Sequence, residues 1–162
     1  MNQPVVDTIT GFLDYTGIGY IKRPINGETF LPGLLLEKGK IVIDTEKLLY
    51  PGDILHEAGH LAAYAPDVRE TMGDPLSADG GYEMMALAWS YAACLHIGLD
   101  PAVVFHPHGY KGESESLLQN FAEGHYIGLP MLQWLGMAYD KKKAEELNTL
   151  PYPNMISWTR TT

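Results

Sequence analysis

The stretch Met84–Leu95 is the longest strongly apolar part of the chain, and it constrains the fold more than any other segment. As a helix that includes the preceding Glu83, it is apolar nearly all the way round, which is typical of a helix buried on every side. About 20 apolar residues are needed to cross a bilayer, so this stretch is too short to span one. The sequence therefore predicts a buried helix over Tyr82–Ile97, ended by Gly98 in the left-handed conformation.

Length and charge narrow the class of protein further. A chain of 162 residues is sufficient for a single domain over residues 1–162, and it contains no repeat and no low-complexity linker. Lys and Arg total 11 against 20 Asp and Glu, which gives a net charge of −9. Nucleic acids and anionic lipids are bound by clustered basic side chains, so we expect neither a nucleic acid nor a membrane as partner.

The single cysteine and the N-terminal residues indicate in which cellular compartment the protein is expected. Cys94 is the single cysteine, so no intramolecular disulfide can form. The first residues lack the basic flank and the long apolar run of a secretory signal. We therefore expect a soluble cytoplasmic protein.

The sequence predicts mainly strands before residue 50 and mainly helices after it. The part before it is expected to be strand-rich, with β-formers over Gly17–Ile25. A hairpin follows, in which the loop Glu37–Lys40 joins Leu34–Leu36 to Ile41–Ile43. Besides the buried helix, we predict helices over Gly52–Tyr64, Ser114–Ile127 and Met131–Leu147, a loop at Val68–Gly81, and a tail at Leu150–Thr162 that crosses the body. A small sheet followed by helices is an α+β fold.

The segment His56-Glu57-Ala58-Gly59-His60 carries the pattern most closely tied to chemistry. Residues four apart share one face of a helix, so His56 and His60 can present their imidazoles to a single ion. Glu57 lies about 100° further round the helix, where it can reach a water on that ion without ligating it. This arrangement is typical of zinc sites in which the glutamate is the general base. The alternative is that two histidines fall four apart by chance.

A catalytic zinc site usually has three protein ligands, and Glu83 is the predicted third. It precedes a helix expected to be buried, where an unpaired carboxylate is costly and metal ligation removes the cost. The alternative places Glu83 in an exposed first turn, where an acid suits the helix dipole. Cys94, His106 and His108 are weaker ligand candidates.

The remaining histidines, His96 and His125, lie on predicted helices. We interpret both as structural or surface residues without a role in the site.

With a glutamate on a second helix, the motif resembles those of the zincin metallopeptidases of the gluzincin type, and in its short format the ImmA/IrrE-like zincin domain. The resemblance is specific over Tyr50–Leu95. It implies a zincin-like fold, in which a small antiparallel or mixed sheet precedes an active-site helix and a helical C-terminal half. It also implies His56, His60 and Glu83 as metal ligands and Glu57 as base and proton shuttle.

The sequence departs from the family pattern at a residue that supports the metal ligands. Thermolysin-like enzymes carry an aspartate four residues after the ligand glutamate to support a histidine ligand, and Leu87 occupies that position here. Support for the ligands must then come from elsewhere, with Asp53, Asp74 and Asp79 as candidates.

The implied function is that of a zinc-dependent peptidase or amide hydrolase. One zinc ion with three protein ligands and a water would let that water attack a carbonyl, with Glu57 as general base. His106, His108 and Tyr110 are candidates for an oxyanion or substrate contact, with Tyr82 a weaker one. A peptide or protein substrate would lie extended along Lys40–Asp44 if that strand is at the sheet edge, and elsewhere if it is internal.

Two alternatives compete with the hydrolase. Two histidines and one carboxylate also suit non-heme iron oxygenases, although the helical spacing with Glu57 adjacent favours hydrolysis. The second alternative is a non-catalytic zincin-like protein that binds or regulates a partner.

Overall fold

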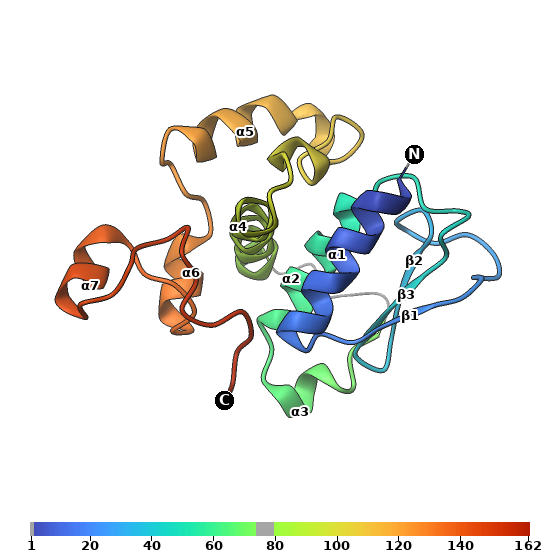
Figure 1. The fold of residues 1–162 in the computed structure, drawn as a ribbon, viewed down its shortest axis with the longest axis horizontal. Helices are drawn as coiled ribbons and strands as arrows, with labels where there is room; N and C mark the ends of the chain where they lie inside the picture. Colours follow the sequence, from blue (N-terminus) through green and yellow to red (C-terminus); the bar gives the residue numbers. More distant parts are fainter. Residues whose placement is uncertain (1, 74–79) are drawn as a thin grey trace.

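The computed structural model describes residues 2–73 and 80–162. It has an α+β architecture, as predicted. Helix α4 (Gly80–Ile97) lies in the middle, with α1 (Gln3–Thr16), α2 (Gly52–Ala62) and a small sheet on one side (Figure 1). The smaller helical elements are α3 (Pro66–Arg69), η1 (Pro101–Val103), η2 (Tyr110–Gly112), α5 (Ser114–Ala122), α6 (Leu129–Trp134) and α7 (Lys141–Glu146). Among the helices formed by the described residues, none combines the length and the hydropathy needed to cross a bilayer.

Helix α1 corrects the prediction of a strand-rich first third. Its buried residues Val6, Ile9 and Leu13 recur at helical spacing and fill one face, while the opposite face is exposed. Gly17, with φ of 83°, ends the helix by donating its N–H to the carbonyl of Leu13. The helix therefore forms because its apolar residues follow a period of 3.6 rather than 2.

The sheet has three strands, β1 (Tyr20–Lys22), β2 (Leu34–Glu37) and β3 (Lys40–Ile43), in the order β1-β3-β2. The predicted hairpin is confirmed, because β2 and β3 pair antiparallel. Its turn is tighter than expected: Glu37 pairs with Lys40, and Lys38 and Gly39 both have positive φ. β1 pairs parallel to β3 on the other side, so β3 is internal. Of the two alternatives for Lys40–Asp44, the internal one is therefore confirmed, and β3 is not open to a substrate strand.

The buried helix and the crossing tail are both confirmed. In α4 every residue from Met85 to Cys94 is buried, and Gly98 has φ of 72° as expected of its cap. The C-terminal segment packs on this helix through two hydrogen bonds. Tyr152 donates its hydroxyl to the Ala88 carbonyl at 2.7 Å, and the Trp89 indole donates to the Trp158 carbonyl at 2.9 Å.

The C-terminal helices are shorter than predicted. Instead of one helix over Met131–Leu147, the structure has the two helices α6 and α7. Gly136, with φ of 73°, interrupts the helical backbone. Asp140 caps the start of α7, because its side chain accepts a hydrogen bond from the Lys143 N–H. The helix predicted over Ser114–Ile127 is α5, which stops at Ala122 shortly before Gly124 at φ of 84°.

The boundaries nearer the site differ by smaller amounts. α2 ends at Ala62, two residues earlier than predicted, and α4 begins at Gly80, two residues earlier. The loop predicted over Val68–Gly81 holds the last turn of α3 and the start of α4, and its residues 74–79 lie outside the described residues.

Candidate metal centre

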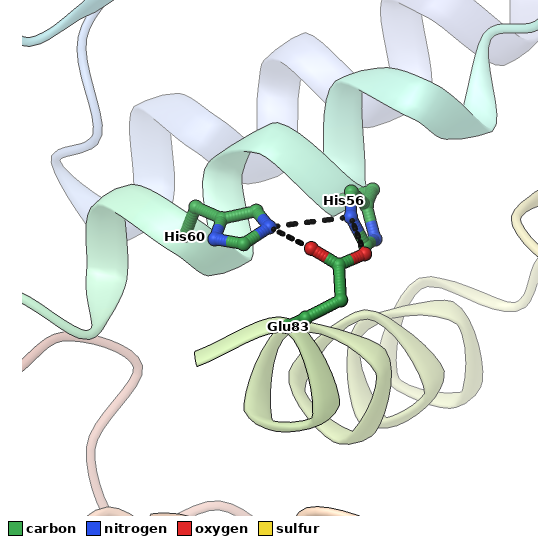
Figure 2. Close-up of side chains that lie close together, drawn as sticks. All are labelled: His56, His60 and Glu83. Carbon is green, nitrogen blue, oxygen red and sulfur yellow. Dashed lines mark hydrogen bonds and ion pairs between the residues drawn. The ribbon is translucent and has the colours of Figure 1, made fainter. Parts of the chain in front are cut away.

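Helix α2 carries the two histidines into the centre of the molecule. It starts directly after Pro51, and its first residue, Gly52, packs so closely on Val103 that a Cβ there would overlap the Val103 carbonyl. This glycine lets the segment after α4 pass against the start of α2. His56 and His60 both lie on the face of α2 turned toward α4 (Figure 2).

Three side chains converge between α2 and α4. Nε2 of His56 lies 2.8 Å from Oε1 of Glu83, and Nε2 of His60 lies 2.8 Å from Oε2 of the same carboxylate. The two imidazole nitrogens are 3.3 Å apart. Figure 2 shows Glu83 reaching from the first turn of α4 toward both rings. All three ligand atoms lie within 4.8 Å of one another, so the three residues predicted as ligands are brought together.

Burial of the three residues differs from the prediction in one respect. His56 and His60 are buried, at 9% and 4% exposed. The Glu83 side chain is 50% exposed, because the first turn of α4 is open and burial begins at Met85. The expectation that burial forces this carboxylate onto a metal is therefore wrong. Its place beside the imidazoles follows from the crossing of the two helices.

The donor set has the chemistry of a zinc site. The separation of its two nitrogens already matches such a site, whereas each nitrogen lies 2.8 Å from a carboxylate oxygen, a hydrogen-bond distance. Two ligands of a tetrahedral site with bonds of about 2.0–2.1 Å are about 3.3 Å apart, and the imidazole nitrogens already have this separation. Two neutral imidazoles and one carboxylate are a ligand set that catalytic zinc sites use. His56, His60 and Glu83 could thus hold a metal ion together.

The electrostatics of the cluster follow from its contacts. Burial lowers the pKa of His56, but the hydrogen bond and charge of Glu83 outweigh burial and leave this pKa raised. The charges of Glu57 and Asp53 act in the same direction. Hydrogen bonds from His56 and His60 in turn hold the pKa of Glu83 well below its ordinary value. The cluster therefore favours a deprotonated carboxylate, the form that binds a cation.

Glu57 differs from its helical neighbours in exposure. From Gly52 to Ala63, all of which the structure describes, it is the one residue that is not buried. Its charge acts on His56 and on Tyr110, so the carboxylate lies near the cluster. Glu57 thus combines partial exposure with a place near the cluster.

Of the residues predicted to contact an oxyanion or substrate, Tyr110 lies closest to the cluster. Its hydroxyl is 3.5 Å from Nδ1 of His56, the ring nitrogen that does not face Glu83. Burial, followed by the charges of Asp53 and Glu83, raises the pKa of Tyr110, so its hydroxyl stays protonated.

His106 and His108 gather around Tyr50 instead. Nε2 of His106 is 2.8 Å from Oδ1 of Asp53, and its ring stacks on Tyr50 at 4.2 Å. Burial raises the pKa of Asp53, although His106 opposes that shift. His108 is exposed and stacks on Tyr50 at 5.3 Å. Asp53, a predicted support for the ligands, is thus hydrogen-bonded to His106 rather than to His56 or His60.

The other residues singled out from the sequence lie in various places. Tyr82 stacks on Tyr64, one helical turn after His60, at 4.5 Å. Cys94 is fully buried in α4, where burial raises the pKa of its thiol to about 12, as expected of core packing. Asp74 and Asp79 lie outside the described residues.

The two histidines expected to be structural or surface residues are exposed. His96 stacks on Tyr15 at 5.8 Å, and His125 lies 3.9 Å from the carboxylate of Glu123.

Comparison of the chain with models of protein families, with curated proteins and with solved structures finds no match. The account of this site therefore stands on its residues and their geometry.

Proposed function

We propose that the chain is a zinc-dependent hydrolase of peptide or amide bonds, with a zincin-like fold of the gluzincin type. The observation that carries the proposal is the convergence of His56, His60 and Glu83, from two helices, beside the partly exposed Glu57. Glu57 directly follows the first histidine and is partly exposed, which is the placement that a general base beside the ion requires. The order histidine, glutamate, and histidine four positions after the first supplies both the ligands and the base.

The chemistry divides between the ion and the side chains. A zinc ion bound here would polarise the substrate carbonyl and make a nearby water more acidic. His56, His60 and Glu83 would hold the ion. Glu57 takes the proton of the attacking water on its carboxylate and returns it to the departing amine. Burial of the two imidazoles keeps bulk water from competing for their Nε2 atoms.

The substrate we propose is an extended peptide or protein segment. Main-chain pairing with an edge strand would hold such a segment with little sequence selectivity. Because β3 is internal, the pairing strand would be β1 or β2.

The proposal is tested with zinc-loaded protein and a mixture of synthetic peptides of varied sequence, with cleavage followed by mass spectrometry. The wild-type chain should cleave a subset, lose activity when a chelator removes the metal, and regain it when zinc is returned. Glu57→Gln should keep bound zinc yet cleave about 100- to 10,000-fold more slowly. Cleavage by Glu57→Gln at the wild-type rate, or intact peptides with zinc-loaded wild type, would contradict the proposal. Oxygen-dependent turnover with bound iron would instead support the oxygenase alternative.

A further inference from the structure

The contact between Tyr110 and His56 joins the candidate metal centre to a segment far along the chain. Oη of Tyr110 lies 3.5 Å from Nδ1 of His56, and the two rings meet edge-on at 76°. Nε2 of the same imidazole faces Glu83 at 2.8 Å. The tyrosine hydroxyl and the carboxylate therefore contact different nitrogens of one ring.

A histidine that binds a metal through Nε2 carries its proton on Nδ1 and needs an acceptor for it. A tyrosine hydroxyl oxygen can accept that proton in a hydrogen bond. We propose that Tyr110 is a positioning residue for His56: its hydroxyl accepts the Nδ1–H and fixes the ring with Nε2 toward the metal. This inference rests on the metal site of the proposed function and names the residue that orients one of its ligands.

The backbone at Tyr110 supports this role. Its φ is 57°, in the left-handed region that large side chains rarely adopt. Residues persist in such conformations where the surrounding structure determines them, and they cluster at functional sites. The Tyr110 ring packs edge-on against the Phe105 ring, with centroids 5.7 Å apart and an interplanar angle of 88°. This packing restricts the ring while its hydroxyl contacts His56.

The segment before Tyr110 is fastened to the helix that carries His56. His106 is hydrogen-bonded at 2.8 Å to Asp53, which lies in the first turn of α2, and both residues are buried. Gly109 covers the face of the His106 ring, where a Cβ would lie 3.3 Å from Cε1. The Asp53–His106 bond thereby ties the segment that carries Tyr110 to the helix that carries His56.

This geometry also separates the positioning role from that of an oxyanion donor. An oxyanion donor has to face the reacting carbonyl, on the Nε2 side of the ligand ring. The hydroxyl of Tyr110 contacts the opposite nitrogen. Loss of the hydroxyl should therefore weaken metal binding itself, before any substrate is present.

The test uses Tyr110→Phe in the full chain, with Tyr91→Phe as matched control. Tyr91 is buried and stacks on the same Phe105 at 6.3 Å, so it tests the loss of a hydroxyl near the site but not at His56. Zinc affinity is measured by competition with a chromogenic chelator, and the bound site is compared by the visible absorption of Co²⁺. Tyr110→Phe should bind zinc about 10- to 100-fold more weakly and shift the Co²⁺ bands. Tyr91→Phe should match wild type in both.

A second measurement needs no variant. In zinc-loaded wild type, the Nδ1–H proton of His56 should give a slowly exchanging NMR signal, because Tyr110 accepts it at a partly buried contact. Equal zinc affinity and Co²⁺ spectra in wild type and Tyr110→Phe, or a fast-exchanging Nδ1–H, would overturn the inference and leave the proposed function standing. A wild-type chain that binds no zinc would overturn the proposed function and this inference with it.

Discussion

Gly59 and Ala86 face each other where α2 crosses α4, so closely that a Cβ built on Gly59 would lie 3.1 Å from the Cα of Ala86. The single glycine of the motif segment His56–His60 thus allows the two helices to approach. That approach brings Glu83, three residues before Ala86, within 2.8 Å of both imidazoles. The geometry of the candidate site therefore depends on a missing side chain as well as on the three that are present.

Gly59→Ala is expected to weaken zinc binding while both helices remain formed. The added methyl group meets the backbone of α4 at Ala86, which cannot turn aside like a flexible side chain, so the helices must separate by a few tenths of an ångström. The carboxylate then loses its joint contact with the two rings. Zinc affinity by chelator competition should fall at least about tenfold, with an unchanged far-UV circular dichroism spectrum.

Gly11→Ala is the matched control for that variant. Gly11 also lies inside a helix, but a Cβ there meets nothing within 4 Å. Alanine should stabilise α1 by about 1 kcal/mol in urea unfolding and leave zinc affinity as it is. Zinc binding by Gly59→Ala as tight as that of Gly11→Ala would show that the close approach of the helices is not needed.

Much of the site could be predicted from sequence because its signals are local. The spacing of His56 and His60 follows from the helical period, and the apolar run after Glu83 predicts a second buried helix. The prediction of a strand-rich first third failed for α1 because the glycines and β-formers that favour strands follow residue 16, whereas Val6, Ile9 and Leu13 before it recur at helical spacing.

Other features depend on tertiary contacts and leave no trace at sequence level. Asp53 and His106 are 53 residues apart, and His56 and Tyr110 are 54 apart, with no pattern that links them. The internal position of β3 depends on its parallel pairing with β1, from which β2 separates it in the sequence, and hairpin signals do not specify that pairing. For Glu83 the sequence leaves two alternatives open, because its exposure depends on where along α4 burial begins.

The free energy of unfolding of the metal-free chain should depend on pH through His56 and Glu83. The folded-state pKa of His56 is raised above 6.5, so its contribution is complete below about pH 6.5 and is lost as pH rises through the raised value. The folded-state pKa of Glu83 is lowered, so its contribution is complete above about pH 4.5 and is lost as pH falls through the lowered value. The pair therefore stabilises the metal-free chain most between about pH 4.5 and pH 6.5.

Urea unfolding of metal-free wild type and Glu83→Gln at about pH 6 and about pH 9 checks this dependence. The stability difference between the two chains should be larger at the lower pH, because His56 loses its proton at the higher one. Zinc affinity should change in the opposite direction and rise with pH, since protons compete for the imidazoles. A stability difference that is the same at both pH values would contradict the assigned pair.

Arg69 is expected to stabilise the end of α2 that follows His60. Its guanidinium donates to the carbonyls of Leu61 at 2.8 Å and Tyr64 at 2.9 Å, and to that of Arg160 in the C-terminal segment at 2.8 Å. Arg69→Met should lower the free energy of unfolding by about 3 kcal/mol, because these carbonyls lose a charged donor.

The control for Arg69 is a surface arginine. Arg23 pairs with Glu37 at 2.8 Å, but both side chains are well exposed, so Arg23→Met should cost less than about 1 kcal/mol. Equal losses in the two variants would mean that the contacts of Arg69 with the end of α2 contribute no more than a surface ion pair.

The metal content of purified chain tests the central claim most directly. Wild type and His60→Ala, purified without added chelator and checked for equal helix content, are analysed for zinc by mass spectrometry. We expect about one zinc per wild-type chain and little in His60→Ala, because that variant keeps two of the three ligands. Equal, tightly bound zinc in both samples, or none in wild type reconstituted with zinc, would contradict the site formed by His56, His60 and Glu83.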